Sequence, residues 1–201
     1  YMHRRGLKLG LYAVEHSQSA QSVKHGAFRI SDINTFAEWG IDALKVDGCY
    51  ADPTAFGKLY PELGRILNAT NRPILYSCSW PAYLPDRGEK NDVLVKEIAP
   101  ACNLWRNFED IRDSWASVQG ITNFWARNSP TNVLVRAAGP GHWNDPDMMY
   151  GQGRRGYADP RTFRGTQPPA PWMWRVLVGN NGLSLSEQES QFALWAILAA
   201  P

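Results

Sequence analysis

The sequence lacks long hydrophobic runs and any strong excess of charge of one sign. No apolar stretch approaches the roughly 18 residues that a membrane-spanning helix needs, so we expect no membrane span. The 201 residues carry a formal net charge of only +2. This balance gives no electrostatic reason to expect nucleic acid as a partner, because such proteins usually carry a clustered basic excess.

Cysteine and histidine are also scarce. The three cysteines, Cys49, Cys78 and Cys102, leave one unpaired after any single disulfide, and their spacing is not that of a metal site. Of the four histidines, only His142 lies near the candidate carboxylates introduced below. We therefore expect neither a metal centre nor another cofactor.

What the sequence does contain is a regular alternation of strand-like and helix-like segments. Apolar strand patterns occupy residues 7–13, 43–47, 73–78 and 102–106, and helical patterns follow them. No hairpin signal separates consecutive strands, so the alternation predicts a parallel sheet with crossover helices, which is an α/β fold. Nine tryptophans suit either a core or a sugar-binding cleft, which often uses indole faces.

Polar residues recur at the expected carboxyl ends of the strands. Tyr12, Asp47, Ser79, Asp110 and Asp147 follow one another at intervals of 31 to 37 residues, the length of one βα unit. A polar group at every strand end predicts a (β/α)8 TIM barrel, whose active site lies at that face. A complete barrel takes about 250 residues, so we expect a partial one. A doubly wound sheet is the alternative, although its ligand would normally bind at one switch point.

Residues 44–50 (LKVDGCY) are the most informative segment. They predict a short buried strand that ends in Asp47, after which Gly48 lets the backbone turn away. Lys45 and Asp47 point to the same side of a strand, and a neighbouring lysine favours the ionised carboxylate. Such a carboxylate suits a nucleophile or a general base. A structural ion pair at the strand end is the alternative.

Asp110, the second carboxylate at a strand end, extends this interpretation to glycoside hydrolysis. That reaction needs one group to attack or stabilise the anomeric carbon and another to protonate the leaving oxygen. Arg106 and Asp147 would bind substrate hydroxyls, or Arg106 would hold a neighbouring carboxylate. The alternative is that Asp110 and Asp113 cap the start of a helix and that Asp145 and Asp147 are turn residues around Pro146.

Four segments in chain order resemble glycoside hydrolase family 27, which contains the α-galactosidases and α-N-acetylgalactosaminidases. Residues 36–50 resemble the family's nucleophile region, 76–83 its substrate-selecting loop, 102–111 its acid/base segment and 138–148 a further binding segment. The resemblance covers nearly the whole chain, except residues 150–175 and a weak stretch near 14–27.

The resemblance implies roles for individual residues. Asp47 is implied as the nucleophile and Asp110 as the acid/base of a retaining hydrolysis. The implied substrate contacts or site walls are Tyr12, Lys45, Cys78, Ser79, Ala82, Tyr83, Arg106 and Asp147. The implied partner is a carbohydrate with terminal α-linked N-acetylgalactosamine or galactose, and we expect the full-length protein to be a homodimer.

The resemblance also implies a protein larger than these 201 residues. The family fold is a (β/α)8 barrel followed by an antiparallel β domain, and the chain would contain about strands 3 to 7 of the barrel and no β domain. We therefore interpret residues 1–201 as a fragment of the catalytic barrel that is inactive on its own. Family members are typically lysosomal or secreted, which fits a glycosylation sequon at Asn68.

The chain departs from the family pattern at two places. The family cysteine that pairs with the one at position 49 has no counterpart, so we expect Cys49 to be unpaired and Cys78 and Cys102 to form a disulfide. Residues 150–175 form an insert rich in proline, glycine and arginine, which is either retained intron sequence or a lid over the site.

Two small residues bear on substrate choice. The α-galactosidase pattern carries Glu and Leu where this chain has Ser79 and Ala82. Ser79 can donate to an acetyl carbonyl and Ala82 leaves room for the acetyl methyl group, so the pattern resembles the α-N-acetylgalactosaminidase branch. The alternatives are an α-galactosidase and an inactive carbohydrate-binding relative.

Overall fold

The computed structural model describes residues 1–14, 30–49, 51–85, 93–128, 130, 132–149 and 182–198. Within them, five strands form one sheet in the order β1-β2-β3-β4-β5. Their bounds are β1 Gly10–Val14, β2 Ala43–Asp47, β3 Leu75–Cys78, β4 Leu104–Arg106 and β5 Trp143–Asp145. The predicted insert at 150–175 lies outside the described residues.

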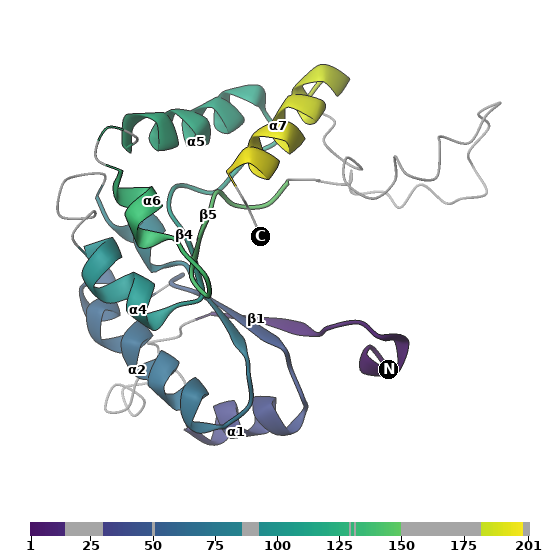
Figure 1. Ribbon diagram of the computed structural model, residues 1–201, viewed down its shortest axis with the longest axis vertical. Helices are drawn as coiled ribbons and strands as arrows, with labels where there is room; N and C mark the ends of the chain where they lie inside the picture. Colours follow the sequence, from purple (N-terminus) through teal and green to yellow (C-terminus); the bar gives the residue numbers. More distant parts are fainter. Residues whose placement is uncertain are drawn as a thin grey trace.

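The strand order identifies the sheet as an arc of a barrel. Each strand pairs in parallel with the next one along the chain, and the order never reverses. A doubly wound sheet would reverse its order at a switch point. Helices α1, α2, α4 and α6 lie along one side of the strands in Figure 1. The predicted α/β fold with crossover helices is therefore confirmed.

The helices alternate with the strands, mostly as the sequence predicts. They are α1 Ile30–Glu38, α2 Phe56–Ala69, α4 Ala99–Ala101, α5 Trp115–Asn128, α6 Val133–Ala137 and α7 Leu185–Ile197. Short 3-10 turns occupy His3–Arg5, Pro53–Ala55 and Trp80–Tyr83, and a π-helical turn occupies Leu94–Ile98.

Helix α2 fixes the position of β2. The helix begins after a turn in which Asp52 accepts a hydrogen bond from Thr54 N at 2.9 Å. Its apolar residues recur every three or four positions and therefore share one face. They form one buried cluster with the apolar residues of β2, and the members are Phe56, Tyr60, Leu63 and Leu67 with Leu44 and Val46. Burying each of these large side chains contributes about 1.5–3 kcal/mol.

Gly64 allows α2 to approach α4 closely. A Cβ atom at this position would lie 2.8 Å from the Ala101 carbonyl oxygen, closer than real Cβ contacts allow. A glycine therefore occupies an interior helical position despite its poor helix propensity.

A capping box precedes helix α7. It consists of Ser184 and Glu187, whose side chain and backbone groups bond to each other. The same Ser-x-x-Glu pattern recurs two residues later as Ser186 and Glu189, but the earlier copy is the one at the helix start.

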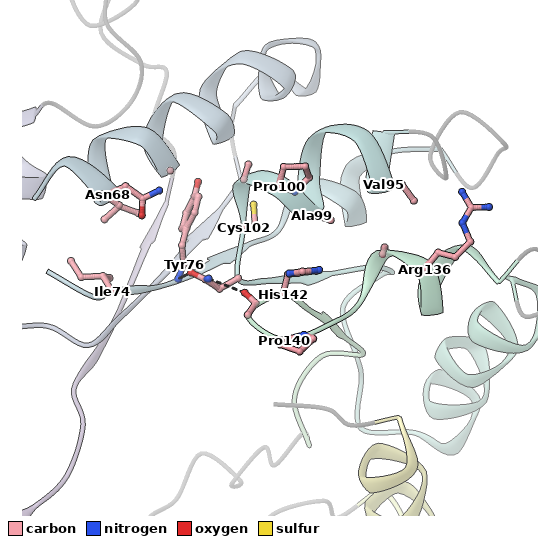
Figure 2. Close-up of a pocket in the computed structure, with 16 residues that line it drawn as sticks. Asn68, Ile74, Tyr76, Val95, Ala99, Pro100, Cys102, Arg136, Pro140 and His142 are labelled. Atoms are coloured by element: carbon pink, nitrogen blue, oxygen red, sulfur yellow. Dashed lines mark hydrogen bonds between the residues drawn. The ribbon is translucent and has the colours of Figure 1, made fainter. Parts of the chain in front are cut away.

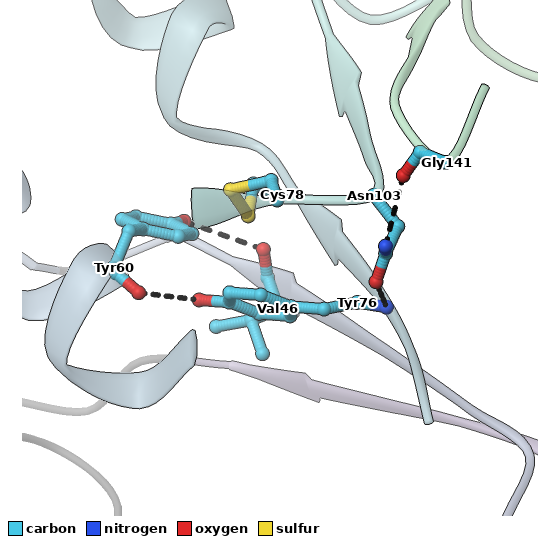
Figure 3. The surroundings of a disulfide bond; sticks show 7 residues. Val46, Tyr60, Tyr76, Cys78, Asn103 and Gly141 are labelled. Carbon is cyan, nitrogen blue, oxygen red and sulfur yellow. Dashed lines mark hydrogen bonds between the residues drawn. A yellow bond between two sulfur atoms is a disulfide. The ribbon is translucent and has the colours of Figure 1, made fainter. Parts of the chain in front are cut away.

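The predicted disulfide is present. Cys78 at the end of β3 is bonded to Cys102 just before β4, with a Cα–Cα distance of 6.1 Å (Figure 3). This distance lies within the usual range for disulfides. Cys49 is a free, half-buried thiol, as predicted.

Candidate active site

Asp47 is the last residue of β2, and two tyrosines hold its carboxylate. The Tyr12 hydroxyl donates to Oδ2 at 2.6 Å and the Tyr83 hydroxyl donates to Oδ1 at 2.6 Å. Tyr12 lies on β1 and Tyr83 in the turn after β3, so the strands on either side of β2 place both donors. Asp47 is only 6% exposed, so these donors replace most of the water that a carboxylate normally binds.

The two residues after Asp47 close around it. The backbone N–H of Cys49 donates to Oδ1 at 3.3 Å, and its thiol lies 3.3 Å from Oδ1 and 3.4 Å from the Tyr83 hydroxyl. Gly48 does not adopt the left-handed conformation that the predicted turn would use. A Cβ atom there would lie 2.6 Å from the Phe56 ring and 3.0 Å from Tyr83. Close packing, rather than a turn, is therefore what requires glycine at this position.

These donors keep Asp47 ionised. Burial raises the pKa of the Asp47 carboxyl, but hydrogen bonds from Tyr12, Tyr83 and Cys49 outweigh burial, and the pKa lies below its ordinary value. Burial and the bond to Asp47 raise the pKa of both tyrosines, so both hydroxyls stay protonated. An ionised, anchored carboxylate is the state that a nucleophile requires.

The predicted influence of Lys45 differs from the observed one. Besides its hydrogen bonds, the main charge that lowers the pKa of Asp47 is Arg106. The charge of Lys45 acts on Asp145, whose pKa is nevertheless raised overall by burial. A simple ion pair between Lys45 and Asp47 therefore does not describe this strand end.

Arg106, the buried last residue of β4, links the second carboxylate to this centre. Its Nη1 donates to Asp110 and lies 3.7 Å from Asp147 Oδ2. Burial lowers the pKa of Arg106, but Asp110, Asp147 and Asp47 together raise it above its ordinary value. One guanidinium thus contacts Asp110 and Asp147, which follow β4 and β5, and acts through its charge on Asp47 at the end of β2.

Asp110 itself is exposed and does not cap a helix. Helix α5 begins at Trp115, and the Ser114 hydroxyl oxygen accepts a hydrogen bond from Ser117 N at 3.3 Å. The observed side-chain partner of Asp110 is Arg106. The capping alternative is therefore wrong for Asp110, and its carboxylate faces solvent beside the guanidinium.

Asp147 is buried and held in a strained turn. Its φ of 80° lies in the left-handed region, which costs about 1–3 kcal/mol for a residue other than glycine. Its carboxylate accepts hydrogen bonds from Ile111 N at 2.9 Å and Met148 N at 2.7 Å, and its own N–H donates to Asp145 at 2.8 Å. The Trp195 indole on α7 donates to its carbonyl at 2.6 Å. Four groups therefore hold the strained residue against Arg106.

Comparison with known proteins identifies the family. The chain matches the family model described as Alpha galactosidase A over residues 1–162. It belongs to this family, glycoside hydrolase family 27. The chain is 41% identical to α-N-acetylgalactosaminidase from Homo sapiens and 40% identical to human α-galactosidase A. Both alignments include the whole chain, but they cover only 42% and 40% of those relatives.

A solved structure of the family confirms the barrel. The crystal structure of α-galactosidase I from Mortierella vinacea matches with a TM-score of 0.66 and 25% identity, over 99% of this chain and 46% of that one. The predicted partial (β/α)8 barrel is therefore confirmed. The chain spans about two fifths of the length of the curated relatives it matches.

The residues that resemble the family's substrate-selecting loop lie at the end of β3. Ser79 is fully buried, and its hydroxyl has no hydrogen-bond partner in the described structure. Ala82 is half-buried and lies in the turn that carries Tyr83. Cys78 is buried in the disulfide, so its side chain belongs to the core.

A cavity of about 450 Å³ lies at the opposite end of the sheet. Figure 2 shows it beside Tyr76, Cys102 and His142. Tyr76 is the second residue of β3, and Cys102 and His142 precede β4 and β5. Apart from Cys102 and Asn68, none of the predicted site residues lines it. The cavity is therefore separate from the Asp47 centre.

The sequence did not reveal three residues that organise the site. The Cys49 thiol contacts Asp47, and Trp195 holds Asp147 from a helix 48 positions away. Asn144 on β5 accepts hydrogen bonds from Trp105 and Asn107 at 2.9 Å each, joining β4 to β5. Only Cys49 had a usable signal, because it follows the strand-end carboxylate by two residues.

The described residues contain no cluster of three or more His, Cys, Asp or Glu side chains arranged to hold a metal ion. Nor does any helix in the described part of the chain have the length and apolar character to cross a membrane.

Proposed function

We propose that the full-length protein is a retaining exo-glycosidase that removes terminal α-linked N-acetylgalactosamine from glycolipids and glycoproteins. The observation that carries the proposal is the buried, ionised Asp47, held by Tyr12 and Tyr83 beside the Arg106–Asp110 pair. Relatives named α-N-acetylgalactosaminidase and α-galactosidase A support glycosidase chemistry.

In this mechanism Asp47 attacks the anomeric carbon while Asp110 protonates the leaving oxygen. Water then hydrolyses the glycosyl ester, and Asp110 takes a proton from that water. The lowered pKa of Asp47 suits a nucleophile, and the exposure of Asp110 suits proton exchange with the leaving group and water. Arg106 orients Asp110, and Lys45 and Asp147 contribute to the sugar-binding wall.

The preference for N-acetylgalactosamine rests on Ser79 and Ala82. The Ser79 hydroxyl is buried without a partner, and an unpaired buried hydroxyl costs about 1–3 kcal/mol. An acetyl carbonyl that reaches it would supply the missing acceptor. The small Ala82 side chain leaves space for the acetyl methyl group.

An α-galactosidase is the second candidate function. The 40% identity to human α-galactosidase A favours it almost as strongly as the 41% identity to α-N-acetylgalactosaminidase favours the first. An inactive carbohydrate-binding relative is the third, and the unpaired thiol of Cys49 beside the nucleophile favours it.

We further propose a lysosomal or secreted protein. The Cys78–Cys102 disulfide supports an oxidising compartment, and the sequon residue Asn68 is exposed at the end of α2. The proposed full-length protein is a homodimer with a complete barrel, and the 201 residues alone are proposed to be inactive.

The first experiment tests the catalytic pair in the full-length protein. Asp47→Asn should lower kcat by at least about a thousandfold while the protein stays folded, because removing a nucleophile removes the covalent route. Asp110→Asn should lose far more activity on an alkyl α-glycoside than on a nitrophenyl α-glycoside, because nitrophenolate leaves without being protonated. Glu109→Gln, a neighbouring exposed carboxylate, is the control. Normal turnover by folded Asp47→Asn would refute the proposal.

The second experiment tests the sugar. Wild type should show a higher kcat/KM for nitrophenyl α-N-acetylgalactosaminide than for nitrophenyl α-galactoside. The double change Ser79→Glu, Ala82→Leu should reverse the preference, because the carboxylate accepts from a 2-hydroxyl and leucine fills the acetyl space. Ala82→Leu alone avoids a charge at the buried Ser79 and should reduce the N-acetyl preference by about tenfold or more. A wild type that prefers galactose would favour the second candidate function.

A further inference from the structure

Arg106 is flanked in the chain by two residues that bind the same side chain. The Trp105 indole donates to Asn144 Oδ1 at 2.9 Å, and the Asn107 amide donates to the same oxygen at 2.9 Å. The Asn144 amide donates in turn to the carbonyl of Leu134 in α6 at 2.7 Å. One side chain on β5 therefore joins both chain neighbours of Arg106 to a helix.

The three side chains of this network are shielded from water. Trp105, Asn107 and Asn144 are 0%, 1% and 4% exposed. A buried polar group that loses its partner finds no water to replace it, so each of these bonds is costly to break. Segments that pack around the sheet in a longer protein would only bury the network further.

The network adds to a main-chain pairing that is short. β4 and β5 have three residues each, and Arg106 lies opposite Asp145 in their register. Successive residues of a strand point to opposite faces, so a slip of one residue would turn Arg106 away from the site. Trp105 precedes Arg106 directly, so Asn144 holds the register from the face opposite the guanidinium.

The register of β4 against β5 decides what Arg106 can contact. Its Nη1 donates to Asp110, which follows β4, and lies 3.7 Å from Asp147 Oδ2, which follows β5. The Asp147 N–H donates to Asp145 at 2.8 Å and so ties that carboxylate to β5. A shift between the two strands would therefore move the guanidinium relative to both carboxylates.

We propose that Asn144 is a positioning residue for the acid/base step, because it fixes β4 against β5 and so holds Arg106 where the guanidinium orients Asp110. This inference rests on the proposed glycosidase and deepens it. As the glycosidic bond breaks, the leaving oxygen takes the electron pair of that bond and the proton of Asp110. A misplaced acid slows this step most when the leaving group is a poor one.

Two leaving groups separate this role from a general loss of stability. In the full-length protein, Asn144→Ala should lower kcat/KM on an alkyl α-glycoside about tenfold or more beyond its effect on a nitrophenyl α-glycoside, whose leaving group needs no proton. Ile33→Ala, a buried change in α1, is the control: it should lower the unfolding midpoint but leave the ratio of the two substrates unchanged. Equal losses on both substrates in Asn144→Ala would refute the role.

A conservative variant tests the hydrogen bonds themselves. Asn144→Asp keeps an acceptor oxygen for Trp105 and Asn107, so its substrate ratio should stay near that of the wild type even where its unfolding midpoint falls. The same ratio in Asn144→Asp and Asn144→Ala would show that the bonds from β4 are not responsible. Asn107→Ala removes one of the two donors and should change the ratio in the same direction by a smaller factor. An unchanged ratio in folded Asn107→Ala would also overturn the inference.

Asp110→Asn distinguishes failure of this inference from failure of the proposed function. If Asp110→Asn depends strongly on the leaving group and Asn144→Ala does not, only the role of Asn144 is disproved. If Asp110→Asn shows no such dependence, or the wild type hydrolyses neither α-glycoside, the proposed function is wrong and this inference falls with it.

Discussion

Asp47 obtains its charged state from neutral donors. A buried carboxylate beside a single lysine would depend on one long, flexible side chain, whereas Tyr12 and Tyr83 are rigid and lie on neighbouring elements. Rigid donors fix the direction of the carboxylate as well as its charge, and direction matters to a nucleophile. The sequence placed both tyrosines in the site as sugar contacts, but it did not indicate that they bind the nucleophile.

Gly48 affects both the stability of the protein and the position of the Tyr83 hydroxyl at the site. Gly48→Ala would place a methyl group against Phe56 and Tyr83, which should cost about 1–3 kcal/mol of stability by overpacking. It should also lower kcat, because the displaced Tyr83 hydroxyl holds Asp47. Urea unfolding and steady-state kinetics of the full-length variant measure the two effects.

Gly120→Ala is the matched control for this change. A Cβ atom at Gly120 in α5 would meet no atom within 4 Å, so alanine should stabilise the helix by up to about 1 kcal/mol. Its kcat should match that of the wild type. If Gly48→Ala behaved like Gly120→Ala in both measurements, the packing role of Gly48 would be disproved.

Helix α7 contacts the site through the indole of Trp195. Trp195 packs in a small cluster with Ile111, Val118 and Ile121, and its N–H binds the carbonyl of Asp147. The helix therefore supports the backbone of a residue whose φ is unfavourable. This support comes from a helix, whereas the sequence predicted site residues only at the strand ends.

Replacing Trp195 should remove a hydrogen bond that supports Asp147, although Trp195 lies on α7 and not at a strand end. Trp195→Phe keeps an aromatic ring but leaves the Asp147 carbonyl without its donor, which should destabilise the protein by about 1–3 kcal/mol. KM should rise, because Asp147 adjoins Arg106. Phe192→Leu on the exposed side of the same helix should shift stability by no more than about 0.5 kcal/mol. Similar unfolding midpoints for the two variants would contradict this role.

At the scale of the whole molecule, the sheet has a charged network at the end opposite Asp47. Asp42 precedes β2 and accepts hydrogen bonds from Leu9 N at 2.8 Å and from Arg72 at 3.2 Å, and it lies 2.7 Å from the His3 ring nitrogen. The Leu9 and His3 contacts hold the pKa of Asp42 well below its usual range. These contacts join the segment before β1 to the segments before β2 and β3.

The sign of the pH effect follows from this lowered pKa. Asp42 contributes stability above its unfolded-state pKa of about 4, and that contribution is lost as pH falls. Asp42→Asn should therefore be less stable than the wild type near neutral pH, and the difference should shrink below about pH 4. Thermal unfolding across pH measures it, with Glu109→Gln as the control. A constant difference across the acid range would show that the charge of Asp42 is not responsible.

The sequence predicted the framework of the molecule better than its contacts. Strand ends could be found because apolar runs stop at polar residues such as Asp47, and their spacing revealed repeated βα units. The hydrogen bonds from Tyr12 and Tyr83 to Asp47, and the ion pair between Arg106 and Asp147, join residues more than 30 positions apart. Such contacts depend on side-chain direction after folding, which periodicity does not specify. Which of the two Ser-x-x-Glu patterns, at 184 or at 186, forms the capping box depends in the same way on where α7 begins.

The unbroken strand order also bears on how the chain folds during synthesis. Each strand pairs only with its neighbours along the chain, so each βα unit can join the sheet in the order in which the ribosome releases it. β1 to β3 with α1 and α2 need no contact from β4 or β5 to pair with one another. An unpaired strand edge promotes aggregation. In this topology the edge formed last is the one that the next segment to be synthesised will cover.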